Sequence, residues 1–141
     1  MADRILGIDY GVRRIGVAVA DTELRIAMPL TTLEGRNDVT RDARNVADLG
    51  AVEQAQSFVV GLPLSMNGAD SAQTGLTRRF AAELGRLSAR PVALQDERLS
   101  SAAADDAMAA AGAPAAARAG HRDSIAAQQI LQSYLDRSQA G

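Results

Sequence analysis

The hydrophobic pattern at the start of the chain predicts three short strands. Residues Arg4–Tyr10 are mainly apolar and alternate, and Ile15–Ala20 is rich in β-branched residues. The four residues Gly11-Val12-Arg13-Arg14 between them have the length of a hairpin connection. A third strand is expected over Ala27–Leu33, because the turn cluster Glu34–Asp38 ends it. Together these segments predict a three-stranded antiparallel meander.

Helices and strands are expected to alternate in the middle of the chain. Apolar residues recur at helical spacing after Asp38, which can cap the first turn, and again from Ala72 to Ser88. The apolar run Ser57–Leu62 is too short for a buried helix, so it predicts a central strand. Another strand is expected over Val92–Gln95, after a proline.

The C-terminal part of the chain predicts two more helices with a loop between them. Ser100 can cap a helix that ends before Gly112-Ala113-Pro114, where glycine and proline stand in the order typical of a helix stop. The alanine-rich stretch Ala113–Gly120 is expected to be a mobile loop. The last helix is indicated by an apolar stripe that comprises Ala127, Ile130, Leu131, Tyr134 and Leu135.

This order of elements, βββαβαβαα, predicts an α/β fold. Its mixed sheet joins the antiparallel meander to parallel strands, and helices cover both faces, which is the RNase H-like layout. A chain of 141 residues has the usual size of one domain. We therefore expect residues 1–141 to form a single domain.

Composition removes several kinds of site and partner. The chain has no cysteine, which excludes disulfides and thiolate chemistry and suits a reducing cytoplasm. It has no signal-peptide pattern and no apolar stretch of membrane-spanning length, so we expect a cytoplasmic protein with no membrane partner. The net charge is −2 and all fifteen basic residues are arginines. Any binding of phosphate must therefore be local.

Three acidic residues at the ends of predicted elements are candidates for chemistry. Asp9 lies in an apolar strand, where an ionised carboxylate needs a partner or a metal, although turn amides could also satisfy it. Asp96 and Glu97 follow a strand and point to opposite faces, so only one of them can face Asp9. Asp123 shares the sheet-facing stripe of the last helix with Ala127, with helix capping as the alternative.

Three carboxylates from separate elements would suit a site for hard cations. Such a site needs oxygen ligands, an incomplete protein shell, and room for water and phosphate. Two Mg²⁺ or Mn²⁺ ions about 4 Å apart can then activate a water and stabilise the leaving oxygen. Periodicity alone does not establish that the three residues converge.

Four blocks of the sequence resemble the defining blocks of the YqgF/RuvX family. They occur in the family's order and cover essentially the whole chain. Members resemble RuvC-type Holliday junction resolvases in fold, and they are described as resolvases or as pre-16S rRNA nucleases. The blocks are LGIDYGVRRIGVAVAD (Leu6–Asp21), VVGLPLSMNGADSAQT (Val59–Thr74), DERLSS (Asp96–Ser101) and RDSIAAQQILQSYLD (Arg122–Asp136).

The resemblance implies a set of site residues. It makes Asp9, Glu97 and Asp123 the catalytic and metal-binding triad, and it selects Glu97 over Asp96. His121 is not assigned as a general base, because it is better explained as a solvated loop residue. The loop Pro63–Gly68 offers backbone amides to phosphate, with a tight turn as the alternative. The candidate substrate-binding residues are Arg14, Asn67, Arg98, Arg118 and Arg122.

The resemblance also implies an activity and its partners. We expect a nuclease that hydrolyses phosphodiester bonds with two Mg²⁺ or Mn²⁺ ions, in 5′-end processing of pre-16S rRNA during ribosome biogenesis or in Holliday junction resolution. Its partner is then a DNA junction or a precursor rRNA, and a resolvase would act as a homodimer. The alternatives are a catalytically silent scaffold and an actin-like nucleotide-binding fragment. Length opposes the fragment, because such enzymes close two similar domains around the nucleotide.

Overall fold

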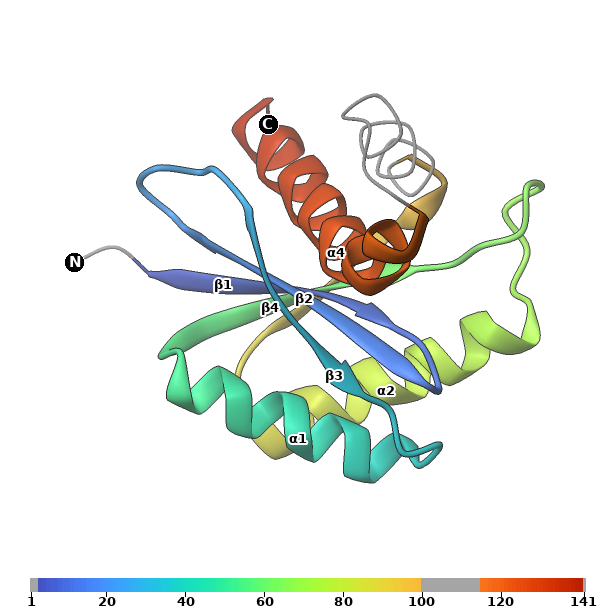
Figure 1. Ribbon diagram of the computed structural model, residues 1–141. Helices are drawn as coiled ribbons and strands as arrows, with labels where there is room; N and C mark the ends of the chain where they lie inside the picture. The colour runs from blue at the N-terminus through green and yellow to red at the C-terminus, as the bar shows by residue number, and fades with distance from the viewer. Residues whose placement is uncertain (1–2, 100–114, 141) are drawn as a thin grey trace.

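A computed structural model describes residues 3–99 and 115–140, with the backbone alone for 99, 115–121 and 139–140 (Figure 1). No helix in these described ranges is both long and apolar enough to cross a membrane. The elements, in chain order, are β1 (Arg4–Tyr10), β2 (Arg14–Asp21), β3 (Met28–Glu34), α1 (Val39–Val52), β4 (Ala55–Leu62), α2 (Ala72–Ser88), β5 (Val92–Asp96), the 3₁₀ turn η1 (Glu97–Leu99) and α4 (Ala115–Ala140).

One mixed sheet organises the fold. Its five strands lie in the order β3-β2-β1-β4-β5. The first three strands pair antiparallel with one another, whereas β4 is parallel to both β1 and β5. Helix α4 crosses one face of the sheet, and α1 and α2 cover the other (Figure 1). The predicted meander, parallel strands and two-sided helical cover are therefore confirmed.

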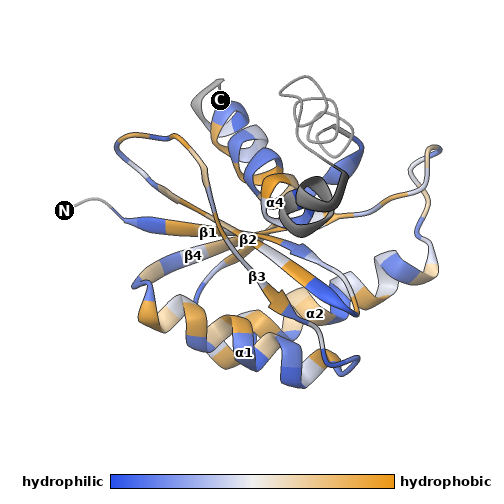
Figure 2. Cartoon of the chain, viewed as in Figure 1, coloured by the Kyte–Doolittle hydropathy of each residue, from blue (hydrophilic) through white to orange (hydrophobic). Residues whose placement is uncertain are grey.

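Strand alternation divides the core into two clusters, one on each face. On the face of α1 and α2, Leu6 and Ile8 of β1 pack with the buried Phe58 and Phe80. On the other face, Val59 of β4 packs with α4 residues Ala127, Ile130, Leu131 and Leu135. In Figure 2 hydrophobic colours accordingly run along the central strands, whereas hydrophobic and hydrophilic colours alternate along the helices. Because β1 and β4 bury both faces, they read as continuous apolar runs in the sequence.

Local signals explain where the two helices on one face begin. Asp38 caps α1 by accepting a hydrogen bond from the Arg41 amide at 3.1 Å, as predicted. At the start of α2, Ser71 and Thr74 form a capping box. The observed bounds of α2 equal the predicted Ala72–Ser88.

The predicted loop over Ala113–Gly120 is wrong where it can be compared. Residues 115–120 are helical and form the first turns of α4. Alanine has the highest helix propensity of any residue, so an alanine-rich stretch can extend a helix even where no apolar stripe predicts one. The helix predicted from Ser100 to before Gly112 lies outside the described residues. Since α4 begins at Ala115, Asp123 lies inside the helix, which excludes the capping alternative.

Replacing Gly7 in β1 tests how closely α4 packs on the sheet. A Cβ at Gly7 would lie 2.7 Å from the Leu131 Cβ and 3.0 Å from the Ala127 carbonyl oxygen, whereas a Cβ at Gly75 of α2 meets nothing within 4 Å. Gly7→Ala should lower the free energy of unfolding by about 1–3 kcal/mol. Gly75→Ala should raise it by about 0.5–1 kcal/mol. Urea unfolding measures both, and an unchanged midpoint for Gly7→Ala would contradict this packing.

Candidate active site

Asp9 lies between two glycines on neighbouring strands. It pairs with Gly16 of β2, and continuing the parallel register of Ile8 with Val60 places Gly61 of β4 on its other side. A Cβ at Gly16 would overlap the backbone carbonyl of Asp123, and one at Gly61 would lie 2.8 Å from the Glu97 Cγ. The missing side chains therefore leave room beside Asp9 for the other two predicted acids.

Alternation along β5 separates Glu97 from Asp96. Gly61 pairs with Gln95 and Leu62 with Asp96, so Gln95 shares the face that carries Asp9 and Asp96 does not. Glu97 begins η1 directly after β5, and its side chain forms a hydrogen bond with Asp9. Asp96 instead binds Arg98, with 2.6 Å between its Oδ2 and the Arg98 Nη2. The prediction that only one of the two acids faces Asp9 is confirmed, and that acid is Glu97.

Burial raises the pKa values of both Asp9 and Glu97. Burial is the main cause that raises the pKa of Glu97 to about 8, followed by its hydrogen bond to Asp9 and the negative charges of Asp9 and Asp96. The pKa of Asp9 is also raised, mainly by burial; the Glu97 hydrogen bond lowers it and the charge of Asp123 raises it. Glu97 thus holds a proton that it donates to Asp9, and the two carboxyls titrate as a pair.

Asp123 reaches the same region from α4, and its carboxylate lies against Arg14. The Arg14 Nε is 3.3 Å from the Asp123 Oδ2. That oxygen is buried and accepts no hydrogen bond, while the Arg14 side chain is 61% exposed. Arg14 therefore supplies positive charge to Asp123 without satisfying its hydrogen-bonding capacity.

The donor chemistry of the three acids suits a hard divalent cation, although their arrangement is not closed around one. Within residues 3–99 and 115–140, no three acidic or histidine side chains are placed to hold one ion as they stand. Asp123 lies against Arg14 instead. Half-buried carboxylates with raised pKa values and an unsatisfied carboxylate oxygen are groups that a cation would stabilise. The ligand assignment stays a prediction.

Two of the predicted substrate-binding residues are engaged within the protein. The Arg98 guanidinium holds Asp96 and also donates to the Met66 carbonyl oxygen at 3.2 Å. The Asn67 Oδ1 accepts the Ala69 amide at 3.0 Å, in a tight turn where Gly68 has a positive φ of 85°. Arg98 thereby ties the loop after β4 to the end of β5.

Apart from Arg14 of β2, the remaining predicted basic residues belong to α4. Arg122 is exposed, and the side chains of Arg118 and His121 lie outside the described residues. A role in substrate binding therefore stays a prediction for all five candidates. The glycines beside Asp9 were missed as site residues, because their importance depends on neighbours in other strands. The only signal for them in the sequence is a glycine within an otherwise β-branched run.

The chain matches the model of one protein family over residues 3–137, described as RuvX: Holliday junction resolvase. A protein of Rhodopseudomonas palustris strain BisB5, named "Putative pre-16S rRNA nuclease", is 43% identical over 94% of this chain and 82% of its own. A protein of Methylobacillus flagellatus with the same name is 42% identical over 94% of this chain and 90% of its own.

The fold also resembles a solved structure at low sequence identity. Thermus thermophilus RuvC in complex with a Holliday junction substrate superposes with a TM-score of 0.61 and 14% identity, over 98% of this chain and 96% of that chain. At that identity the likeness concerns the fold alone. It confirms the predicted RNase H-like architecture.

The stability of the metal-free protein should fall as pH rises between about 4.5 and 8. Glu97 ordinarily ionises near 4.5 but has a pKa of about 8 in the folded protein, so the folded state retains a proton that the unfolded state releases. Its contribution is fully present below 4.5 and is lost as pH rises through about 8. Urea unfolding in EDTA should show this decline in wild type and a smaller one in Glu97→Gln.

Asp96→Asn is the matched control for this titration. The hydrogen bond from Arg98 lowers the pKa of Asp96. The contribution of Asp96 to stability is therefore lost as pH falls, whereas that of Glu97 is lost as pH rises. The control should keep most of the decline between 4.5 and 8. Equal declines in wild type and Glu97→Gln would show that Glu97 is not the group responsible.

Proposed function

Because the chain belongs to the RuvX family of Holliday junction resolvases, we propose that it is a metal-dependent nuclease that hydrolyses phosphodiester bonds. The observation that carries the proposal is the half-buried, hydrogen-bonded pair of carboxyls Asp9 and Glu97, whose pKa values are raised, with the charge of Asp123 acting on Asp9. Such a pair destabilises an empty fold when both groups ionise, but it provides ligands for a cation. A catalytically silent scaffold would gain nothing from it.

Asp9, Glu97 and Asp123 would hold the divalent cations. Mg²⁺ or Mn²⁺ ions bound there, two in the full form of the proposal, would lower the pKa of a water nucleophile and stabilise the leaving oxygen. Glu97 keeps its proton at neutral pH when no cation is bound, so cation binding must displace that proton. Asp123 would turn from Arg14, which frees the guanidinium to bind a substrate phosphate.

A precursor of 16S rRNA is the first substrate to test. Two relatives at 43% and 42% identity carry the name of a pre-16S rRNA nuclease, whereas RuvC, solved with a Holliday junction, is only 14% identical. A four-way DNA junction is the second substrate, and its symmetric cutting would need a homodimer. We place the activity in a single domain, residues 1–141, in the cytoplasm. The residues proposed to contact substrate phosphates are Arg14, Asn67, Arg98, Arg118 and Arg122.

Asp9→Asn should abolish cleavage and leave the fold intact. The change keeps the side-chain size but removes a charge that holds the cation, so the rate should fall by about 10²-fold or more. Purified protein is assayed with Mg²⁺, Mn²⁺ or EDTA on a precursor rRNA 5′ segment and on a four-way junction. Mn²⁺ should also raise the melting temperature of wild type and not of Asp9→Asn, because only wild type binds the ion tightly.

The control for Asp9→Asn is Asp96→Asn. It removes the charge of the acid that precedes Glu97 and lies on the other face of β5. It should cut at close to the wild-type rate and keep the Mn²⁺ stabilisation. Cleavage by wild type in EDTA, or wild-type rates for Asp9→Asn, would replace the nuclease proposal with the scaffold.

Arg14→Ala should lower the affinity for substrate more than it lowers the rate of cleavage. Losing one phosphate contact should reduce the slope of log affinity against log salt by about 0.7–0.9. The cleavage rate at saturating substrate should remain. Binding titrations at several salt concentrations and single-turnover cleavage separate the two effects. A rate at saturation that falls as far as in Asp9→Asn would assign Arg14 to the chemical step instead.

A further inference from the structure

Two loops at the Asp9 end of the sheet are joined through their backbones. One connects β1 to β2 and the other connects β3 to α1. The Gly35 amide donates to the Arg13 carbonyl oxygen at 2.7 Å, and the Asn37 amide donates to that of Val12 at 3.3 Å. A Cβ at Gly35 would overlap the Val12 carbonyl oxygen, so this close approach requires glycine.

A buried side chain of α1 also fixes the loop between β3 and α1. Asp42 in the first turn of α1 is fully buried, and its Oδ1 accepts the Arg36 amide at 2.8 Å. Asn37 adopts a left-handed conformation with φ of 53°, which asparagine tolerates well. The Arg36 backbone is therefore held by a buried carboxylate on one side and by the neighbouring loop on the other.

Arg13 and Arg36 in these loops and Arg14 at the start of β2 are exposed, and we define these three residues as the arginine arm. Arg14 connects the arm to the acid cluster through Asp123. The nearby acids only partly offset its charge. Glu34 lies 3.7 Å from Arg36 on the exposed surface, whereas Asp38 and Asp42 direct carboxylate oxygens at backbone amides.

We propose that the arginine arm binds the phosphodiester backbone of a nucleic-acid strand that runs from the acid cluster across the two joined loops. The proposal rests on the proposed nuclease function and adds Arg13 and Arg36 to the substrate-binding residues. Guanidinium groups suit phosphate oxygens because their planar forks donate two parallel hydrogen bonds. Contacts of this kind position a strand without reading its sequence.

We assign binding to the arginine arm rather than to arginines elsewhere on the surface because backbone hydrogen bonds hold its loops in place. Arg78 and Arg86 are also exposed, but they lie on α2 and are paired with Asp70 and Glu83. The loops of the arm are already held by backbone bonds, so a strand that binds there need not order them first. Less conformational entropy is then lost on binding.

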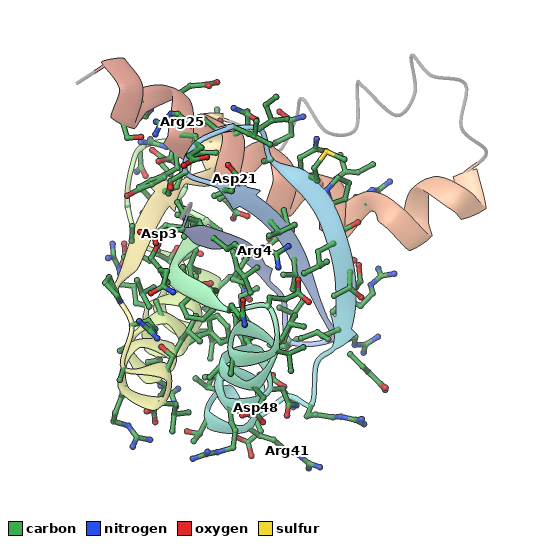
Figure 3. The ribbon with its side chains drawn as sticks, turned by 90° about the vertical axis from the view of Figure 1, so that its left-hand side faces the viewer. Asp3, Arg4, Asp21, Arg25, Arg41 and Asp48 are labelled. Carbon is green, nitrogen blue, oxygen red and sulfur yellow. The ribbon has the colours of Figure 1, made fainter. Side chains whose placement is uncertain are left out.

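The test compares two double variants that remove the same charge. Arg13→Ala with Arg36→Ala removes the new residues of the arm. Arg4→Ala with Arg90→Ala is the control, because Arg4 begins β1 and Arg90 precedes β5, at the opposite end of the parallel strands. Arg4 is labelled at the end of the sheet that faces the viewer in Figure 3. Melting temperatures of both variants verify that the chain remains folded.

Binding is measured by fluorescence anisotropy in EDTA, with labelled single-stranded RNA and DNA of one sequence and a series of salt concentrations. The arm variant should bind both about tenfold more weakly, with a slope of log affinity against log salt smaller by about 0.7 for each arginine removed. The control should bind like wild type. Arg13→Lys with Arg36→Lys, which keeps both charges, should recover most of the slope.

The outcomes separate this proposal from the nuclease assignment. If the arm and control variants lose the same affinity, the effect is one of net charge and the arginine arm is overturned. If the arm variant binds like wild type while Asp9→Asn still abolishes cleavage, the arginine arm is overturned and the nuclease assignment stands. If wild type binds neither RNA nor DNA at any salt concentration, the arginine arm is overturned, whereas the nuclease assignment is decided by the cleavage assay of wild type and Asp9→Asn. A loss confined to RNA would overturn the assignment to phosphodiester groups.

Discussion

The structure depends on accommodating carboxylates where strands are buried on both faces. Asp9 lies in β1 between two neighbouring strands, with apolar residues of the same strand packed on either side of the sheet. An ionised group there is unfavourable unless it has a partner. Glu97 provides that partner, because it keeps its proton and donates a hydrogen bond to Asp9. The two acids can therefore share a half-buried position at neutral pH, where two negative charges would repel each other.

Glycine makes that arrangement possible sterically. The places on β2 and β4 next to Asp9 have no side chain, and the Asp123 backbone and the Glu97 side chain occupy the space. Helix α4 can approach so closely because its apolar stripe packs on β1 and β4 along the same face. The position of Asp123 thus follows from how α4 lies on the sheet, and the core that stabilises the fold also assembles the site.

Much of this could be predicted from the sequence, because periodicity reports which face of an element is buried. Alternation correctly separated Glu97 from Asp96, and helical spacing identified α2 to the residue. Convergence of the acids could not be derived in this way, since it depends on strand register and on glycines in neighbouring strands. The start of α4 was missed for a different reason. The helical residues 115–120 have high helix propensity but no pattern that distinguishes them from a loop.

The net charge of −2 does not oppose the proposed binding of a polyanion, because the local surface decides that binding. The long-range field of an acidic protein does not attract nucleic acid, and at physiological salt it is screened within about 8 Å. What a strand meets on close approach is therefore the local surface. Near Asp9 that surface combines acids that suit cations with arginines held on fixed backbone. A bound cation would reverse the local charge, so that acids unfavourable to phosphate in the empty site become part of its binding site.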